Sequence, residues 1–389
     1  MPSRIMIVAG EASGDLHGAN MVRALKDLAP DLSFCGMGGA EMAGQGVEIL
    51  YDASRTAVVG IFEVIAHLAD IRAAMRTLEE RLRQDRPDLL VLIDFPDFNL
   101  ILAGKAKKLG IPVFYYISPQ VWAWRSGRVR KIRRRVDRMA VILPFEEEFY
   151  RRHGMTVDFV GHPLMDSVRT SGSRNELLAR HGIEAETTII GLLPGSRHKE
   201  IATLLPVFLD AARLLAREIP RPVFLLPLAP TLARADLERH GLTDSPLDVR
   251  VVSENRYNLM AACRGVMTAS GTATLELAIL GVPMVVCYRM SPLTYFLGKR
   301  LIQVKFASLV NLVAGRPAVP ELLQDKATPE AIARELGEML RNPERHAAIC
   351  RDLSAVRVKL GGAGASGRTA RKILELIGNG GAPDQAGTP

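Results

Sequence analysis

The chain of 389 residues is long for one domain and comfortable for two. Hydrophobic residues make up 48% of it and aromatic residues 5%, which predicts a folded protein with an aliphatic core and excludes a disordered chain. The formal net charge of +8 and the pI of about 9.4 favour an anionic partner, such as nucleic acid, anionic lipid or a phosphorylated substrate.

The sequence contains no signal for export or for a membrane span. The apolar run within Met1–Gly10 is short and leads directly into the polar stretch Glu11–Asp15, unlike a signal peptide. No stretch reaches the ~18 continuous apolar residues of a transmembrane helix. The four cysteines are scattered without metal-binding spacing, which is typical of small buried side chains in a reducing compartment. We therefore expect a cytoplasmic protein.

The first part of the chain alternates short apolar runs with helical patterns. A turn at Gly10–Gly18 leads from the first run into a helix that ends near Leu28. The alternation predicts a parallel, doubly wound sheet whose ligand-binding loops follow the carboxyl ends of the strands. The expected strands are Arg4–Val8, Leu32–Cys35, Leu89–Ile93, Pro112–Ile117, Met139–Leu143 and Val157–Val160.

The second part repeats this pattern after a turn-rich segment at Gly161–Asp166. Its expected strands are Thr188–Leu192, Val223–Leu226, Val249–Val252, Val266–Thr268 and Met284–Cys287. The sequence therefore predicts an α/β protein with two Rossmann-like doubly wound domains that face a cleft. We expect these domains at residues 1–165 and 166–345, C-terminal helices at 346–378 and a disordered Gly/Pro-rich tail at 379–389.

Two strand–turn–helix segments in the second part are typical of phosphate binding. In each, a glycine lets the backbone approach an anion, a hydroxyl side chain follows, and a helix begins with free N–H groups. The first segment adds an arginine fork, and the second adds a glutamate that suits the hydroxyls of a ribose. Together they predict a nucleoside diphosphate site, although such turns also occur without a ligand. The residues concerned are Gly195, Ser196, Arg197, Ser270, Gly271, Thr272 and Glu276.

Several acidic side chains follow strands in the first part. Asp94 and Asp97 come directly after an apolar run, where either carboxylate could act as general base for an incoming hydroxyl. Asp97 could instead cap the helix that begins there. Asp15 and His17 follow the first strand, and Glu11 is a further candidate; His17 is either a base or a helix-entry residue without a role.

A densely apolar segment at Thr56–Leu68 interrupts the alternation and is followed by several arginines. It predicts either a buried crossover helix or a surface that contacts acyl chains or dips into a bilayer. The residues of this apolar surface are Val58, Ile61, Phe62, Ile65 and Leu68. The stretch Arg125–Arg138 is too rich in cations for an ordinary solvated face, and we expect it to meet phosphate on a lipid, a phosphorylated acceptor or nucleic acid.

The sequence lacks the characteristic motifs of several enzyme classes. The sequence has no Asp-x-Asp motif of metal-dependent sugar transferases and no Gly-x-x-x-x-Gly-Lys-Ser/Thr loop of ATPases. The first turn, Gly10–Gly14, does not have the pattern Gly-x-Gly-x-x-Gly, which argues against a dinucleotide-dependent oxidoreductase.

Motifs spread from residue 8 to residue 316 resemble those of the lipid-A-disaccharide synthase family. Their number and order make the resemblance specific, and it covers nearly the whole folded chain. The matching motifs are Val8-Ala-Gly-Glu-Ala-Ser-Gly-Asp15, Ile93-Asp-Phe-Pro-Asp-Phe-Asn99, Ser118-Pro-Gln-Val-Trp-Ala-Trp-Arg125, Leu143-Pro-Phe-Glu146, Phe159-Val-Gly-His-Pro163, Leu192-Leu-Pro-Gly-Ser-Arg197, Ser270-Gly-Thr-Ala-Thr-Leu-Glu276, Pro283-Met-Val-Val-Cys-Tyr-Arg-Met290 and Ser308-Leu-Val-Asn-Leu-Val-Ala-Gly-Arg316.

The resemblance implies a GT-B glycosyltransferase that joins UDP-2,3-diacylglucosamine to 2,3-diacylglucosamine 1-phosphate with inversion, releasing UDP. It also implies no metal or other cofactor, a peripheral position on the cytoplasmic face of the inner membrane beside anionic lipids, and a homodimer with exchanged C-terminal segments. The last helix of such proteins crosses back to the first domain. The motifs add Gly14, Asp15, Arg289, Met290 and Asn311 as candidate substrate-binding residues, although Asn311 also fits a satisfied buried amide.

Three other functions are compatible with parts of this pattern. A related GT-B transferase that uses UDP-N-acetylglucosamine carries a different opening loop, and a UDP-sugar epimerase needs no apolar segment. A basic RNA-binding α/β protein would use Arg125–Arg138, but no aromatic residues alternate with these charges to stack on bases.

Overall fold

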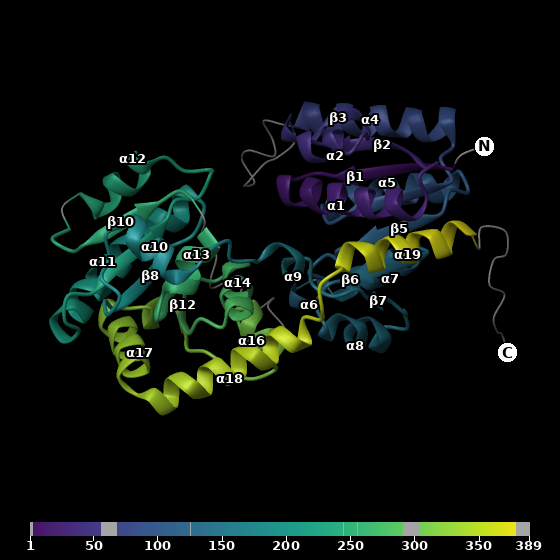
Figure 1. The fold of residues 1–389 in the computed structure, drawn as a ribbon. Helices are drawn as coiled ribbons and strands as arrows, with labels where there is room; N and C mark the ends of the chain where they lie inside the picture. The colour runs from purple at the N-terminus through teal and green to yellow at the C-terminus, as the bar shows by residue number, and fades with distance from the viewer. Residues whose placement is uncertain are drawn as a thin grey trace. The chain divides into compact units, whose positions relative to one another are not determined.

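The computed structural model describes residues 3–55, 68–124, 126–243, 245–254, 256–290 and 304–378. The chain divides into two compact units, of which unit 1 comprises Met1–Pro163 with Gly362–Pro389 and unit 2 comprises Leu164–Gly361. Each unit is a parallel α/β sheet covered by helices (Figure 1). Within the described residues, no helix is long and apolar enough to cross a membrane.

The sheet of unit 1 has seven parallel strands in the order β3-β2-β1-β4-β5-β6-β7. The strands are β1 (Arg4–Ala9), β2 (Ser33–Gly38), β3 (Glu48–Asp52), β4 (Leu89–Ile93), β5 (Val113–Tyr116), β6 (Arg138–Val141) and β7 (Asp158–Phe159). The helices are α1 (Ala12–Leu28), α2 (Ala40–Gly44), α4 (Leu68–Asp85), α5 (Pro96–Lys108), α6 (Val121–Trp124), α7 (Val129–Arg133), α8 (Phe145–Arg152) and α19 (Ala365–Gly378), with 3-10 turns η1 (Ala53–Arg55) and η2 (Ser126–Arg128).

Unit 2 has six parallel strands in the order β10-β9-β8-β11-β12-β13. The strands are β8 (Ile189–Leu193), β9 (Val223–Pro227), β10 (Val249–Val252), β11 (Gly265–Ala269), β12 (Met284–Tyr288) and β13 (Glu321–Leu323). The helices are α9 (Leu164–Ser167), α10 (Arg174–Arg180), α11 (His198–Glu218), α12 (Arg234–Leu237), α13 (Arg256–Ala262), α14 (Ala273–Leu280), α16 (Leu309–Ala314), α17 (Pro329–Arg341) and α18 (Pro343–Lys359), with short turns η3 (Glu238–Leu242) and η4 (Gln324–Lys326).

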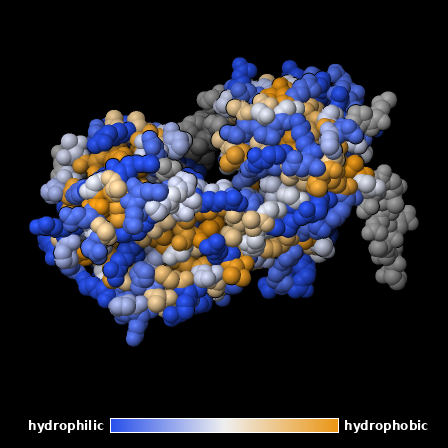
Figure 2. Space-filling view, viewed as in Figure 1, coloured by the Kyte–Doolittle hydropathy of each residue, from blue (hydrophilic) through white to orange (hydrophobic). Residues whose placement is uncertain are grey.

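The central strands are apolar throughout because helices cover both faces of each sheet. In β1, Met6 and Val8 enter one core cluster, whereas Ile5, Ile7 and Ala9 enter the cluster on the opposite face. Residues of α4, α5 and α7 complete the first cluster, and residues of α1 and α19 complete the second. The outer surface is a mosaic of hydrophilic residues interrupted by apolar patches (Figure 2).

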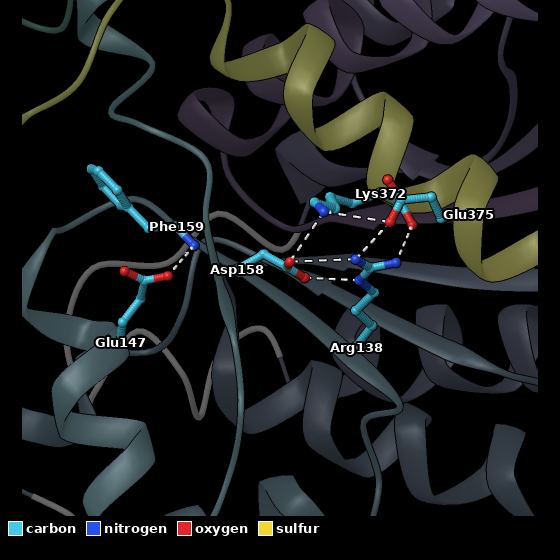
Figure 3. A network of polar contacts seen from close by, with 6 residues as sticks. All are labelled: Arg138, Glu147, Asp158, Phe159, Lys372 and Glu375. Atoms are coloured by element: carbon cyan, nitrogen blue, oxygen red, sulfur yellow. Dashed lines mark hydrogen bonds and ion pairs between the residues drawn. The ribbon is translucent and has the colours of Figure 1, made fainter. Parts of the chain in front are cut away.

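The C-terminal helix α19 belongs to the core of unit 1, although it follows the whole of unit 2 in sequence. It packs along α1, and its Ala370 and Ile373 are buried. Figure 3 shows the ion pairs that join α19 to the sheet, in which Arg138 of β6 pairs with Asp158 of β7 at 2.8 Å and with Glu375 of α19 at 2.7 Å. The same view shows that the N–H group of Phe159 donates to Glu147 at 3.1 Å.

The structure differs from the expected organisation in its edge strands, in where the chain passes between units, and in the unit to which α18 belongs. The sequence pattern did not predict the edge strands β3 and β13, which are short and carry charged or polar residues. The chain passes between units at 163/164 and returns at 361/362, so α18 lies in unit 2 against α14 and α16, and only α19 lies in unit 1. The sequence of α18 has no single apolar face strong enough to reveal which unit it covers.

The contribution of α19 can be measured with Ile373→Ala. This side chain is fully buried, so its truncation should destabilise unit 1 by about 2–5 kcal/mol. Arg371→Ala, at an exposed position of the same helix, should change stability by less than about 0.5 kcal/mol. Urea unfolding followed by tryptophan fluorescence reports on unit 1, because both tryptophans, Trp122 and Trp124, belong to it. Equal midpoints for the two variants would contradict the assignment of α19 to this core.

Candidate active site

The strand order of each unit reverses at one point in the middle of the sheet. In unit 1 this point lies between β1 and β4, which pair in parallel with Ala9 opposite Ile93. The chain leaves β1 toward β2 on one side and leaves β4 toward β5 on the other. Open α/β sheets bind their ligands outside the carboxyl ends of the strands at such a point. The predicted residues Glu11 and Asp94 follow these two strands.

The turn after β4 has an unusual backbone conformation. Asp94 and Phe95 have φ angles of 44° and 47°, in the left-handed region that residues other than glycine rarely adopt. The side-chain amide of Asn99 donates to the carbonyl oxygens of Ile93 and Asp94 at 3.2 and 2.8 Å, and the Tyr115 hydroxyl donates to that of Asp94 at 2.5 Å. These bonds hold the turn and set the direction of the Asp94 side chain.

The Asp94 carboxyl has a raised proton affinity. Solvent reaches the side chain, but the protein atoms packed around it reduce its hydration, and the negative charge of Glu11 adds repulsion. Burial and Glu11 together raise the pKa of Asp94 to about 6. Gly10 leaves room for the neighbouring Phe95 ring, since a Cβ atom at position 10 would lie 2.3 Å from that ring. An accessible carboxylate with such a pKa suits a general base near neutral pH.

Asp97 has a different environment from Asp94. Its side chain is 78% exposed at the start of α5, and one oxygen pairs with the Arg128 guanidinium at 2.6 Å. This ion pair joins α5 to η2, two elements that follow neighbouring strands. Asp97 makes no hydrogen bond as the N-cap of α5, because that position is Phe95.

His17 is half-buried in α1, and burial lowers its pKa to about 4. The neighbouring His162 is buried, and burial together with the charge of His17 lowers its pKa to about 3. Both imidazoles are therefore neutral at neutral pH, and His17 is a weaker base than Asp94.

The Asp15 side chain forms hydrogen bonds within unit 1. It is 5% exposed, and its carboxylate accepts hydrogen bonds from the N–H groups of Gly39, Glu41 and Met42 at 2.7, 3.0 and 3.2 Å. It thereby caps the start of α2 from the neighbouring helix α1. Gly14 is buried against β1, where a Cβ atom would lie 3.3 Å from that of Ala9.

The reversal in unit 2 lies between β8 and β11, where Leu193 is opposite Thr268. Both predicted phosphate turns follow these two strands. Gly195 has a φ of 121°, which favours glycine, and a Cβ atom there would collide with Glu200. Glu200, which the sequence reasoning missed, accepts from the Ser196 N–H group at 2.9 Å and lies 3.5 Å from the Arg197 guanidinium. Arg197 keeps 65% of its side chain exposed.

The second turn leads into α14. Gly271 and Thr272 are exposed, and a Cβ atom at Gly271 would meet no other atom within 4 Å, so the backbone is open to a ligand. The Ser270 hydroxyl donates to the Ala307 carbonyl at 2.9 Å.

Glu276 is buried in the first turns of α14. One of its carboxylate oxygens accepts from the Arg256 guanidinium at 2.8 Å and from the Tyr257 hydroxyl at 3.2 Å. Burial raises the pKa of Glu276, and the positive charge of Arg256 opposes that effect. Both partners lie on α13, where the sequence offered no signal that they would reach this carboxylate.

The remaining three candidates of unit 2 are held by internal hydrogen bonds. The Arg289 guanidinium donates to the Ala327 carbonyl at 2.6 Å, and the Met290 backbone exchanges two hydrogen bonds with the Gln324 side chain. Asn311 is 1% exposed; its amide donates to Val319 and Glu321 and accepts from the Val319 N–H group. This geometry favours the satisfied buried amide over direct contact of Asn311 with a ligand.

The expected acyl-binding residues Val58, Ile61, Phe62 and Ile65 lie outside the described residues. Leu68, at the start of α4, has 37% of its surface exposed. Over the part of the chain that is described, no cluster of three His, Cys, Asp or Glu side chains could hold a metal ion.

Comparisons with known proteins agree with this architecture. Residues 5–371 match the family model described as lipid-A-disaccharide synthetase. The chain is 52% identical over 375 residues to the lipid-A-disaccharide synthase of Geobacter metallireducens, covering 96% of this chain and 97% of that one. It is 49% identical to the enzyme of Nitrosococcus oceani, with 96% and 95% covered.

Solved structures with low sequence identity share the fold. MurG of Acinetobacter baumannii has a TM-score of 0.60 at 14% identity and covers 96% of this chain and 100% of its own. The calicheamicin glycosyltransferase CalG4 has a TM-score of 0.64 at 15% identity, with 98% and 100% covered. The predicted two-domain GT-B fold is thus confirmed, and with the match over residues 5–371 the chain belongs to the lipid-A-disaccharide synthase family.

Proposed function

We propose that this protein transfers 2,3-diacylglucosamine from UDP-2,3-diacylglucosamine to the 6-hydroxyl of 2,3-diacylglucosamine 1-phosphate. The products are the β-1,6-linked disaccharide 1-phosphate and UDP. Membership of the family over nearly the whole chain carries this proposal. The environment of Asp94 supports it, since an accessible carboxylate with a pKa of about 6 lies at the point of unit 1 where such a sheet binds its ligands.

The proposed reaction is a direct displacement. The acceptor oxygen forms a bond to the anomeric carbon while the bond from that carbon to the diphosphate oxygen breaks, so the configuration inverts. Asp94 accepts the proton of the attacking hydroxyl. We assign this role to Asp94 rather than Asp97, because the Arg128 guanidinium already occupies an oxygen of Asp97 and stabilises its charge.

Unit 2 would stabilise the departing UDP. The exposed guanidinium of Arg197 and the N–H groups at the start of α11 and α14 offer positive charge to the diphosphate. Glu276 would contact the ribose with the carboxylate oxygen that Arg256 and Tyr257 leave available. With these groups the diphosphate can depart without a metal ion, and we propose that turnover needs none.

The acyl chains of both substrates suggest where the enzyme works. We propose that it acts at the cytoplasmic face of the inner membrane beside anionic lipids, with the segment 56–68 among its contacts. We also propose a homodimer that exchanges C-terminal segments through the α19 contacts described above. Sedimentation with anionic vesicles and light scattering measure these two properties, and a monomer that stays in solution would exclude both.

Release of UDP tests the proposed function directly. The purified protein should release UDP only when UDP-2,3-diacylglucosamine and 2,3-diacylglucosamine 1-phosphate are both present, and EDTA should not change the rate. UDP release with a different acceptor alone would redirect the assignment to another GT-B transferase. Loss of activity with EDTA that a divalent cation restores would exclude the metal-free reaction.

The two aspartates can be separated by their pH profiles. In the native protein kcat/KM should fall below pH about 6, because protonation of Asp94 removes the base. Asp94→Asn should lower kcat by about 100-fold or more and remove this acidic limb. Asp97→Asn should keep the limb at a reduced rate. The reverse result, with the limb lost only in Asp97→Asn, would assign the base to Asp97.

Arg197→Ala should lower kcat by about 100-fold, the usual effect of removing one preorganised group that stabilises transition-state charge. The side chain is exposed and its ion pair is long, so the thermal midpoint should stay within a few degrees of the native value. Arg213→Ala, at an arginine within α11 whose side chain is 38% exposed, is the control and should retain full activity. Near-native turnover in Arg197→Ala would remove this residue from the reaction.

A further inference from the structure

A cationic hollow lies on the surface of unit 1, apart from the groups assigned above. It has a volume of about 360 Å³ and is lined by Gly127, Arg130, Lys131, Arg134 and Arg135. This volume is in the range of small-molecule binding sites. Four of its five lining residues carry a full positive charge, so an anion is the ligand that its chemistry favours.

The charges of this hollow are not neutralised locally. Elsewhere in the chain, arginines such as Arg81, Arg138 and Arg345 form ion pairs with carboxylates. Within the described ranges, no ion pair involves the four cations of the hollow. The one carboxylate between residues 126 and 138, that of Asp137, already pairs with Lys107 at 2.6 Å and accepts from the Val113 N–H group.

One side of the hollow is fixed in place by α5. The Arg135 guanidinium donates to the Leu100 carbonyl at 2.6 Å and lies against Gly104, where a Cβ atom would be 3.0 Å from its central carbon. A side chain at position 104 would displace this guanidinium. Arg130, Lys131 and Arg134 are exposed and can adjust to a ligand beside this fixed guanidinium.

The hollow is linked to the proposed acceptor site through one ion pair. Gly127 precedes Arg128, whose guanidinium bonds to Asp97 in the helix that follows the Asp94 turn. Arg128 thus connects the start of the hollow to α5, the helix that also holds the Arg135 guanidinium. A hexose acceptor carries its 6-hydroxyl and its 1-phosphate on opposite sides of the ring, so the site for its phosphate must be separate from the base but belong to the same part of unit 1.

We propose that this hollow binds the 1-phosphate of the acceptor and thereby selects a phosphorylated acceptor. The inference rests on the proposed function and extends it, since it assigns one substrate group to named residues. A phosphomonoester carries up to two negative charges and offers three oxygens, and several guanidinium or ammonium groups can bind it at once. The phosphate would also fix the position of the sugar, so that its 6-hydroxyl faces Asp94.

A comparison of two acceptors tests this assignment. The assay uses neutral detergent micelles and measures kcat/KM for 2,3-diacylglucosamine with and without its 1-phosphate. The native enzyme should prefer the phosphorylated acceptor by a large factor. In the double variant Arg130→Gln with Arg134→Gln, the ratio of kcat/KM for the two acceptors should fall by about tenfold or more for each lost contact with the phosphate. Its kcat/KM for the acceptor without phosphate should stay unchanged.

A control with the same change in net charge is available in the same unit. Arg133→Gln with Arg151→Gln removes two exposed arginines that do not line the hollow, one of them on α7 itself. This control should keep the native preference. If both double variants lose the preference equally, the effect is one of overall charge and the proposal is overturned. A native enzyme that is active but indifferent to the phosphate would overturn it too, while the proposed function would stand.

The phosphate of a membrane lipid is the other source of the same chemistry. Binding of the protein to vesicles of phosphatidylglycerol, compared with vesicles of phosphatidylcholine, shows whether the hollow binds lipid phosphate rather than the acceptor phosphate. If the Arg130/Arg134 variant loses binding to the anionic vesicles but keeps the native acceptor preference, the hollow is a membrane contact and the acceptor assignment is wrong. If it loses the preference in neutral micelles, the acceptor phosphate is the ligand.

Discussion

The strand order of the two sheets is the constraint on which the arrangement of functional groups depends. In both units all described strand pairs are parallel, and the first strand lies beside the fourth or its equivalent, β1 beside β4 and β8 beside β11. Parallel strands bring their carboxyl ends to one edge, so residues about 80 positions apart in sequence become neighbours. The carboxylates of unit 1 and the phosphate-type turns of unit 2 all follow these four strands. The same topological feature occurs in both units, and it places the groups to which we assign acceptor and donor chemistry.

The local backbone at Asp94 adds a second constraint. Two consecutive residues other than glycine in the left-handed region cost about 1 kcal/mol or more each. The hydrogen bonds from Asn99 and Tyr115 to the carbonyl groups of the turn contribute about 1 kcal/mol each, so they are comparable with this strain and can offset it. Without the left-handed turn the carboxylate would leave the strand in another direction. Strain kept at this position, with buried polar groups that support it, is characteristic of a site where side-chain direction matters more than stability.

Much of this organisation could be predicted from the sequence, because apolar runs and glycine turns are local signals. The central strands, the turns at Gly195 and Gly271 and the carboxylate at Asp94 belong to this class. Contacts between distant segments could not be predicted, since one sequence carries no register between them. Asp15 was expected to bind substrate, but it caps α2 more than 20 residues away, and Asn311 is bound by Glu321 and Val319. In the edge strand β3 only three apolar residues lie between Glu48 and Asp52, and β13 has only three residues, so neither gives the apolar run that identifies a strand.

The arginines to which we assign a function differ from the structural ones in the availability of their charge. Arg138 forms ion pairs with Asp158 at 2.8 Å and with Glu375 at 2.7 Å, so its charge is neutralised in the contact that holds α19. Among the residues that the structure describes, Arg197 forms one ion pair, with Glu200 at 3.5 Å, and most of its side chain is exposed. A guanidinium that must meet the growing charge of a leaving group cannot already be tightly neutralised, because the new interaction would then have to replace an equally strong one. The cations of the hollow on unit 1 satisfy the same condition, since the one acid in their stretch is engaged elsewhere. In a chain with a net charge of +8, the arginines without a close carboxylate are therefore the ones that can bind an anionic substrate.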